Sequence, residues 1–454
     1  MEKKQNPYLA VSAVILSMIF LQSGNGILIM LIPLAMGSAG ISTTEIGIVA
    51  TTYSCGFLAG CIGAPYIIKR VGHIRAFAAC AAMFSILSLV LSIDVNTIAW
   101  SISRGCIGLC MAGLMMVSES WVSEKTPKES RGRVFAAYML ATKIGLGGAP
   151  LLLGLGSIEG PQFFMLISAF LSLSLVPIAM TKGPSPTLPP MTRLNIGEFY
   201  KIAPAGVVGC VALGMTNSSV FSIMPVYAES HGLQPGMVAG LMTAMQISSL
   251  VVQWPIGWLS DRFDRRMIIV GLCSFMVVIS IVLALIGDVT TLVLYSLFAL
   301  YGGAASTVYA VCIAHTADRA KPELMVAMSS SLLFAWSVGG IIGPTAAATT
   351  MEFVGPGGLF FYTATVAALF VIFVLYRIRE RDAVPTEGRE RFVSLPQPGP
   401  LTSKLDPRMS EEAVKSATDA LRRQTEEEAA DKDTPEDASL DPQDDDSETP
   451  PAKR

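Results

Sequence analysis

Charge is scarce in this sequence. Only 15% of its 454 residues are Asp, Glu, Lys or Arg, whereas 52% are hydrophobic. Soluble domains carry about a quarter charged residues, so this composition excludes an ordinary soluble protein. Histidine is scarcer still, with three residues, and all eight cysteines lie inside apolar stretches. We therefore expect no metal site, and we interpret the cysteines as small packing residues.

Signatures of several protein classes are also missing. We find no Walker A motif and no catalytic triad, which argues against an ATP-driven pump or an intramembrane enzyme. We expect a protein that is not an enzyme, uses no cofactor and does not bind nucleic acid. The first apolar run is too long for the core of a cleavable signal sequence, so we interpret it as a membrane-spanning helix.

The few charges are unevenly distributed. Residues 1–377 hold 20 Lys and Arg with 15 Asp and Glu, whereas residues 378–454 hold 12 and 20. The first part has the composition of a membrane body and the second that of a hydrophilic tail. A segment so polar and acidic cannot bury enough apolar surface to fold. We predict a disordered acidic cytoplasmic tail at 378–454, with a docking segment for a cytoplasmic partner as the alternative.

Twelve apolar stretches are long enough to cross a bilayer, which needs about 20 helical residues. Backbone polar groups cannot stay unpaired in lipid, so these stretches must be helices, and the fold class is an all-α membrane protein. The stretches are 9–36, 45–68, 76–93, 97–122, 133–157, 162–180, 202–228, 235–259, 267–286, 290–314, 324–350 and 357–376.

The loops between these stretches differ in charge. Those after even-numbered stretches carry Lys or Arg, and the six loops on the other side carry none. By the positive-inside rule, both termini are cytoplasmic. We expect a multi-pass protein of the cytoplasmic (inner) membrane.

The chain contains an internal repeat. Residues recur at an offset of 192 positions: Asn25 with Asn217, Pro33 with Pro225, Gly40 with Gly232, and Arg70 with Arg262. We therefore predict an N-terminal six-helix bundle at 1–180, a Pro-rich cytoplasmic linker at 181–201 and a C-terminal six-helix bundle at 202–377. Parallel repeats of this kind are typical of transporters, whose substrate site lies near the midplane between the halves.

Several motifs resemble those of the major facilitator superfamily. The loop GWLSDRFDRR matches a family signature at Gly257, Asp261, Arg262, Arg265 and Arg266, with Asp264 where Gly is usual. Its first-half copy, PYIIKRVGHIR, keeps Arg70 and Gly72 but has Lys69 in the Asp position. A second motif, of hinge or packing type, is matched by Gly339, Gly343 and Pro344, and more loosely by Gly145, Ala149 and Pro150.

The resemblance covers residues 8–377 and implies a fold and a function. It implies a twelve-helix secondary transporter with two pseudo-symmetric bundles that rock around a central site. The looser motif is commonest among proton antiporters of the family. The stretch ESWVSEKTPKESRGRV, from Glu119 to Val134, resembles a branch of bacterial, largely uncharacterised transporters.

Three ionisable residues lie well within predicted spans. Arg104 resembles the family's fourth-helix Arg, which is associated with proton coupling, although an Arg that reaches the outer interface remains an alternative. Lys143, in the middle of the fifth stretch, is a candidate for binding an anionic group or carrying the coupled proton. The alternative is a lysine paired with interhelical carbonyls. Glu119 is a candidate gate or proton acceptor, and equally an interfacial partner of a loop base.

Polar residues in the apolar stretches suggest a substrate pathway. Gln22 and Asn25 share one helix face and are matched by Asn217 in the second half. They are candidates for hydrogen bonds to substrate or for interhelical bonds. Gln246, Tyr309 and Trp336 are as readily packing residues as pathway residues. We interpret the many Met and Phe residues as core and lipid-facing surface.

Charges at the cytoplasmic ends suggest a gate. Under the family's pseudo-symmetry, Asp261 would face Arg131 or Arg133, and Lys69 would face Glu323, with Arg70 and Arg262 beside them. We predict that these pairs close the inner face and favour the outward-open state. The alternative is a set of unpaired interfacial charges.

These observations favour a secondary transporter for a small solute, coupled to protons and exporting drugs or metabolites. The alternatives are uptake of a small polar or anionic solute by symport or facilitation, and a transporter-like receptor or scaffold. The expected partners are the small-molecule substrate, protons and the lipid bilayer, and we expect a monomer.

Overall fold

The computed structural model describes residues 7–126, 130–181, 196–287, 289–321 and 324–380. In these ranges it contains twelve helices that are long and apolar enough to cross a membrane, which confirms the predicted all-α membrane fold. The predicted disorder of the tail concerns residues that lie, apart from 378–380, outside this description.

Each predicted stretch corresponds to one span, with ends that differ by a few residues. The first half contains α1 (Pro7–Ser38), α2 (Thr43–Val71), α3 (His73–Val90), α4 (Thr97–Lys125), α5 (Arg131–Lys143) with its continuations η2 (Ile144–Gly148) and η3 (Ala149–Leu155), and α6 (Gln162–Ala179). The second half contains α8 (Pro204–Ser230), α9 (Pro235–Arg262), α10 (Arg265–Leu285), α11 (Thr291–Ala317), α12 (Met325–Val354) and α13 (Gly358–Glu380).

Local sequence sets several of the helix ends. The Ser42 hydroxyl accepts a hydrogen bond from the Glu45 backbone N–H at the start of α2, and Asn96 caps α4 in the same way. After α1 the chain turns at Gly40 with φ +75°, and after α8 it turns at Gly232 with φ +72°. Only glycine adopts this left-handed backbone freely, so the repeat recognised in sequence extends to the geometry of these turns.

The fifth span is not the continuous α-helix that its length predicts. After Lys143 the helix widens into a π-helix over η2 and then tightens into a 3₁₀-helix over η3. Gly145, Gly147 and Gly148 weaken the α-helical preference here, and Pro150 lacks the N–H that an α-helix would use. Departures of this kind mark functional hinges or strained sequence.

A short helix also lies inside the predicted linker. It is α7 (Ile196–Ile202), and it buries Phe199 completely. Ile196, Phe199 and Ile202 recur every third residue and form one apolar face, which explains why this piece of the linker is helical.

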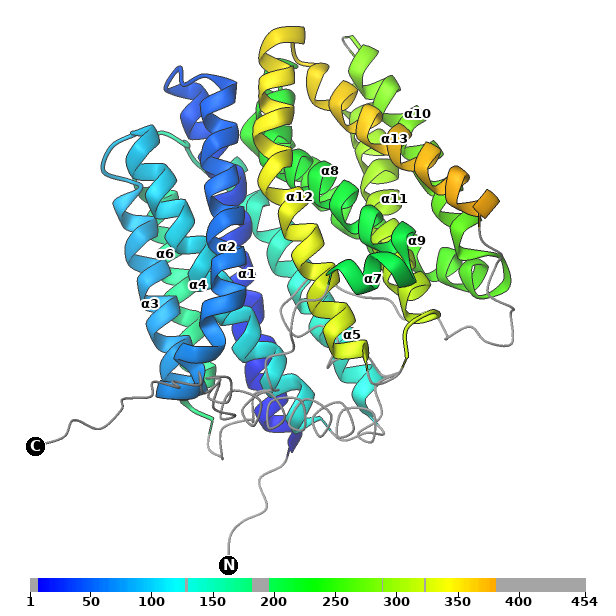
Figure 1. Ribbon diagram of the computed structural model, residues 1–454. Coiled ribbons are helices and arrows are strands. Elements are labelled where there is room, and N and C mark those ends of the chain that lie inside the picture. Colours follow the sequence, from blue (N-terminus) through cyan, green and yellow to red (C-terminus); the bar gives the residue numbers. More distant parts are fainter. Residues whose placement is uncertain (1–6, 127–129, 182–195, 288, 322–323, 381–454) are drawn as a thin grey trace, which may run out of the picture.

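The two halves lie side by side, with α2, α3, α4 and α6 on one side and α9, α10, α11 and α13 on the other (Figure 1). An even number of spans places the start of α1 and the end of α13 at one face, here called the terminal face. The other face of the protein is called the opposite face. Figure 1 has the terminal face toward the bottom.

Two seams join the halves toward the opposite face. The first seam is formed by α2 and α12: Thr51 Oγ1 lies 2.8 Å from Thr345 Oγ1, and the Thr44 backbone N–H donates to Glu352 at 2.9 Å. The second seam is formed by α9 with η2 and η3, where Thr243 donates a hydrogen bond of 2.6 Å to the Gly147 carbonyl. Both seams use the halves of these spans that lie away from the terminal face.

Candidate functional site

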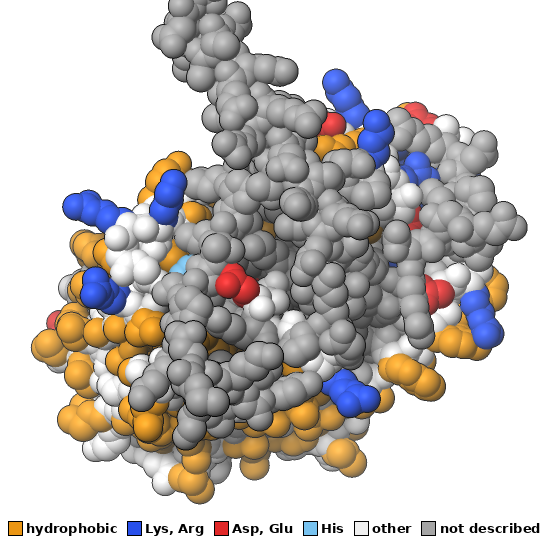
Figure 2. Space-filling model, turned by 90° about the horizontal axis from the view of Figure 1, so that it is seen from below, with side chains coloured by type: hydrophobic (Ala, Val, Ile, Leu, Met, Phe, Trp, Pro, Cys, Tyr) orange, Lys and Arg blue, Asp and Glu red, His pale blue; other side chains and the backbone are white. Residues whose placement is uncertain are grey.

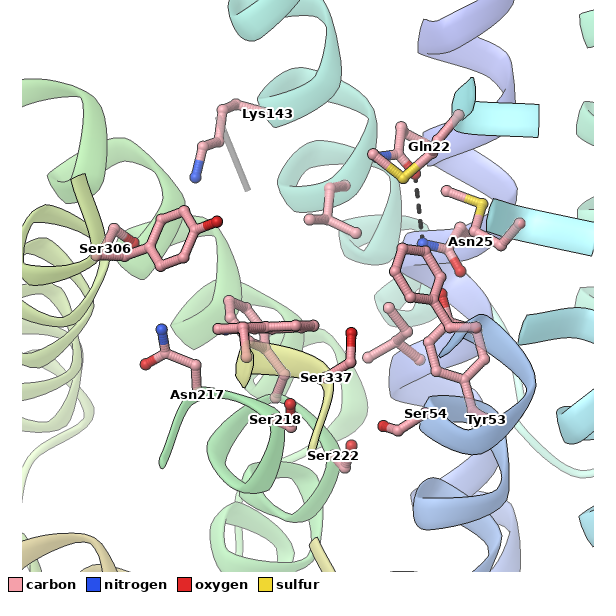
Figure 3. A pocket seen from close by; sticks show the side chains of 18 of the residues that line it. Gln22, Asn25, Tyr53, Ser54, Lys143, Asn217, Ser218, Ser222, Ser306 and Ser337 are labelled. Carbon is pink, nitrogen blue, oxygen red and sulfur yellow. Dashed lines mark hydrogen bonds between the residues drawn. The ribbon is translucent and has the colours of Figure 1, made fainter. Parts of the chain in front are cut away.

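A cavity of about 1170 Å³, part of it open to solvent, lies between the two halves. It begins directly beneath the seams: Tyr53 and Ser54 follow the seam residue Thr51, and Trp336 and Ser337 precede the seam residues of α12. Figure 3 shows side chains from both halves converging on this space. The complete lining is Gln22, Asn25, Ile29, Tyr53, Ser54, Phe57, Arg104, Met111, Met115, Lys143, Leu146, Asn217, Ser218, Phe221, Ser222, Gln253, Ser306, Tyr309, Trp336 and Ser337.

Most of the pathway residues predicted from sequence surround this one cavity. They are Gln22, Asn25, Arg104, Lys143, Asn217, Tyr309 and Trp336. Gln246 lies behind the lining and contacts Lys143, whereas Glu119 is fully buried away from the lining. Residues more than 300 positions apart in the chain, such as Gln22 and Trp336, therefore meet at one place, as the repeat requires.

Arg104 is buried and incompletely paired. Arg104 is 5% exposed, and its guanidinium carbon lies 4.4 Å from the centre of the Tyr53 ring. A desolvated contact of this kind stabilises a cation by about 2 kcal/mol. Its Nε and Nη1 atoms make no hydrogen bond to any residue that the structure describes. The side chain thus keeps hydrogen-bond donors available at the cavity wall.

Lys143 connects the two halves. It is 5% exposed, and its Nζ donates a hydrogen bond of 3.1 Å to Gln246 Oε1 of α9. In Figure 3 its amine points into the open space of the cavity. It is the last residue of α5, so the change from α-helix to π-helix begins directly after it.

The predicted amides are arranged differently in the two halves. Asn25 Nδ2 donates to Gln22 Oε1 at 3.3 Å, so these two side chains bond to each other within α1 (Figure 3). Asn217 projects from α8 on the other side of the cavity (Figure 3). Amides on both sides of the cavity offer hydrogen bonds to a bound molecule.

Glu119 lies in α4, is 0% exposed and is buried among other ionisable side chains. It lies within electrostatic range of Tyr138 of α5, Cys61 of α2 and Tyr309 of α11. Tyr309 also lines the cavity and belongs to the other half. The Glu119 carboxyl group is thus within electrostatic range of one residue of the cavity lining.

The interpretation of Met and Phe as core and lipid-facing residues is wrong for part of this set. Phe57, Met111, Met115 and Phe221 line the cavity. Sequence reasoning also missed Tyr53, although Tyr53 and Phe57 lie one helical turn apart and share a face. Which apolar face of a membrane helix meets lipid and which meets the cavity depends on packing, because both faces have the same composition.

The terminal face carries the motif charges. Lys and Arg side chains stand around the rim of this face (Figure 2). Among the predicted gate residues, Lys69, Arg70, Arg133 and Arg262 are exposed. The side chain of Arg131 and all of Glu323 lie outside the described residues, so the predicted pairs between the halves stay predictions.

Within the second half, these charges form a buried cluster that sequence reasoning did not foresee. Arg265 Nε lies 2.9 Å from Asp318, which directly follows α11, and its Nη2 lies 3.7 Å from Asp261. Asp264 caps α10 and binds Arg266 at 2.8 Å. Burial raises the pKa of Asp264, but hydrogen bonds from Arg266 outweigh burial and hold that pKa below its ordinary value.

The predicted hinge or packing motifs occupy equivalent places in the two halves. A Cβ at Gly145 would lie 2.7 Å from the Ile19 carbonyl of α1, and one at Gly343 would lie 2.3 Å from the Met215 carbonyl of α8. Gly339 approaches the same helix α8 as closely, at the Val211 carbonyl. In each half, therefore, glycines bring the motif helix against the first helix of that half. Pro150 lies in η3 and Pro344 lies in α12.

Comparisons with known proteins agree with this architecture. A sequence profile of the Major Facilitator Superfamily matches residues 14–344 and 206–424. The uncharacterized MFS-type transporter YcaD of Escherichia fergusonii is 26% identical over 351 residues, which cover 77% of this chain and 91% of that protein.

Solved structures share the fold at low sequence identity. The nucleoside transporter NupG has a TM-score of 0.68 at 12% identity, covering 82% of this chain and 100% of its own. A bacterial homolog of the human lysosomal transporter Spinster, in an inward-facing and unoccupied conformation, has a TM-score of 0.66 at 13% identity, covering 86% and 99%. The twelve-helix repeat, the central cavity and the family profile lead to one conclusion: this chain belongs to the major facilitator superfamily of membrane transporters.

Proposed function

We propose that this protein exports a small organic solute across the cytoplasmic membrane by alternating access and couples that movement to protons. The observation that carries the proposal is the position of the cavity, which lies between the halves and directly beneath two seams. Rocking of the halves would open the seams and expose the same lining to the opposite face.

The positive-inside rule makes the terminal face cytoplasmic. The seams then close the outer side, and the described arrangement is the state that receives a solute from the cytoplasm. The looser antiporter motif at Gly145 and Pro150 supports export, since it resembles that of proton antiporters.

We assign the coupled proton to Glu119. Its side chain is fully buried within the span of α4. Rocking of the halves would change its distance from Tyr309, which belongs to the other half and lines the cavity. A carboxyl in such a place can take up a proton in one state and release it in the other.

Transport assays with purified protein in vesicles test this proposal. We expect an imposed proton gradient to drive solute against its concentration, with solute and protons moving in opposite directions. Co-movement in the same direction would instead indicate symport. Absence of flux across a broad solute panel would refute transport and favour a receptor or scaffold.

The proton assignment has its own test. The variant Glu119→Gln should retain exchange of solute between the two sides but lose its dependence on the proton gradient. Glu159→Gln is the matched control, because Glu159 lies exposed in the loop after η3 and should leave coupling unchanged. Gradient-driven transport by Glu119→Gln at the wild-type rate would refute the assignment.

A further inference from the structure

The charge of the cavity lining points to the chemistry of the solute. We propose that the solute is an amphipathic organic anion, whose carboxylate or phosphate group binds between Arg104 and Lys143 while its apolar body lies against the aromatic and Met side chains of the lining. This inference rests on the proposed transport function and names the class of molecule transported.

The lining carries positive charge alone. Of its twenty residues two are basic, Arg104 and Lys143, and none is Asp or Glu. Both cations belong to the first half, on α4 and at the end of α5. A cationic solute would meet two like charges in a site of low dielectric constant, where repulsion is strong. An anion would meet two opposite charges.

The hydrogen-bond balance favours the same conclusion. The buried polar atoms here that lack a described partner are mostly donors: Nε and Nη1 of Arg104, Nε1 of Trp336 and, behind Lys143, Nε2 of Gln246. One acceptor, the Asn25 Oδ1 atom, also lacks a described partner. Buried donors without partners are costly, so a site with several of them suits a ligand rich in acceptors. Carboxylate and phosphate groups supply acceptors only.

Arg104 is suited to a planar or tetrahedral oxyanion. Its guanidinium lies over the Tyr53 ring, a contact that uses none of its N–H donors. A guanidinium held this way binds two oxygens of one anionic group. Lys143 uses one bond for Gln246 and, as an ammonium, has three donors.

The rest of the lining requires an apolar body as well. Phe57, Met111, Met115, Phe221 and Trp336 face the same space. Aromatic and thioether side chains bind apolar surface, and a bare inorganic anion would leave them in contact with water. Hydroxyls and amides of the second half, such as Asn217 and Ser337, provide further hydrogen bonds.

An anion bound at Lys143 would lie close to the second seam. Lys143 bonds across the halves to Gln246, one turn from the seam residue Thr243. Because an ammonium group has three donors, Lys143 can bond to Gln246 and to the anion at the same time. The bound anion would therefore contact a residue that already joins the two halves.

Thermal unfolding of the purified full chain tests the charge requirement. The probes are 3-phenylpropanoate, phenyl phosphate, the neutral 3-phenylpropanamide and the cationic 3-phenylpropylamine. We expect one or both anions to raise the unfolding temperature in a saturable manner. The anion that raises it more identifies whether the solute carries a carboxylate or a phosphate. We expect the amide and the amine to leave that temperature unchanged. Equal stabilisation by the amine or amide, or none by either anion, would overturn the proposal.

Substitutions locate the effect. Arg104→Gln and Lys143→Gln should each weaken the binding of the anion by roughly tenfold or more, as expected for the loss of a hydrogen bond to a charged group. Arg104→Lys and Lys143→Arg keep the charge and should restore part of the affinity, which separates binding from misfolding. Arg75→Gln is the matched control, because Arg75 is exposed on α3 away from the cavity. Wild-type affinity in both Gln variants would overturn the site.

Flux in vesicles distinguishes failure of this inference from failure of the proposed function. Gradient-driven movement of neutral or cationic solutes, unaffected by Arg104→Gln, would preserve transport and refute the anionic substrate. Saturable binding of the anion without any flux would refute transport and preserve the binding site.

Discussion

Replacing Gly56 by Ala should destabilise the protein, because this glycine lies where α2 and α4 cross. A Cβ at Gly56 would lie 1.8 Å from the Gly105 carbonyl oxygen and 2.6 Å from its carbonyl carbon. Gly105 adjoins Arg104, and a Cβ at Gly108, on the next turn, would lie 2.2 Å from the Tyr53 carbonyl oxygen. The close crossing thus brings Tyr53 and Arg104 together at the cavity wall.

The magnitude follows from the geometry of the contact. An added methyl group meets backbone atoms, which cannot rotate away as a side chain would, so the two helices must separate by more than an ångström. Overpacking of this kind costs about 1–3 kcal/mol, and a backbone clash this short places Gly56→Ala near the upper end. The gain in helix propensity, about 0.5–1 kcal/mol, offsets only part of it.

Thermal unfolding in detergent measures the difference against two controls. Gly63→Ala, on the same helix, has no atom within 4 Å of the new methyl and should be neutral or slightly stabilising. Gly105→Ala, at the same crossing, places its methyl 3.5 Å from the Thr52 carbonyl, which is an ordinary contact. We expect Gly56→Ala alone to lower the unfolding temperature by several degrees. Equal unfolding temperatures for all three variants would refute the close approach of α2 and α4.

Two further predictions concern the seams and the buried cluster. Thr51→Val with Thr345→Val removes the two hydrogen bonds that Thr51 makes to α12 in the first seam, each worth about 0.6–1.7 kcal/mol in a membrane, and should shift the equilibrium toward an open opposite face. Backbone hydrogen exchange at the ends of α2 and α12 that form this seam should then accelerate. The control Thr365→Val, at an exposed position of α13, should not change it. Unaltered exchange in the double variant would contradict a closing role for this seam. Asp318→Asn should cost about 3 kcal/mol, because it removes the nearer of the two carboxylates that pair with the buried Arg265 guanidinium, at 2.9 Å, and leaves Asp261 at 3.7 Å. Glu380→Gln breaks a partly exposed pair and should cost well under 1 kcal/mol, so equal losses in thermal unfolding would contradict the importance of burial.

The number and limits of the spans could be predicted from sequence because the bilayer imposes them. Apolar length determines where a helix crosses, and a missing partner for any backbone group forces the helical form. The fifth span shows where that reasoning ends. Its apolar length was sufficient, but the glycines at 145, 147 and 148 and Pro150 allow π- and 3₁₀-geometry that packing against α1 and α9 selects.

The candidate site could be predicted in part. A physical cause separates the lining residues that the sequence reveals from those that it does not. Arg104, Lys143 and Asn217 are conspicuous because a polar group inside a membrane span needs a partner or a cavity. Tyr53, Phe57 and Met111 are not conspicuous, since an apolar side chain is equally stable against lipid, core or ligand. Only the arrangement of helices places them on the cavity.

By itself, the sequence determined the class of the protein, its twelve spans and the repeat, because hydrophobicity and length act locally along the chain. The tertiary structure alone decided which residues meet. It placed Arg104 on Tyr53 and joined Lys143 to Gln246, which lies 103 positions away in the chain. It also buried Arg265 against Asp318 and drew the seams together at one face. These contacts depend on how closely helices approach, and glycines such as Gly56 and Gly343 set that distance through packing that no local pattern reveals.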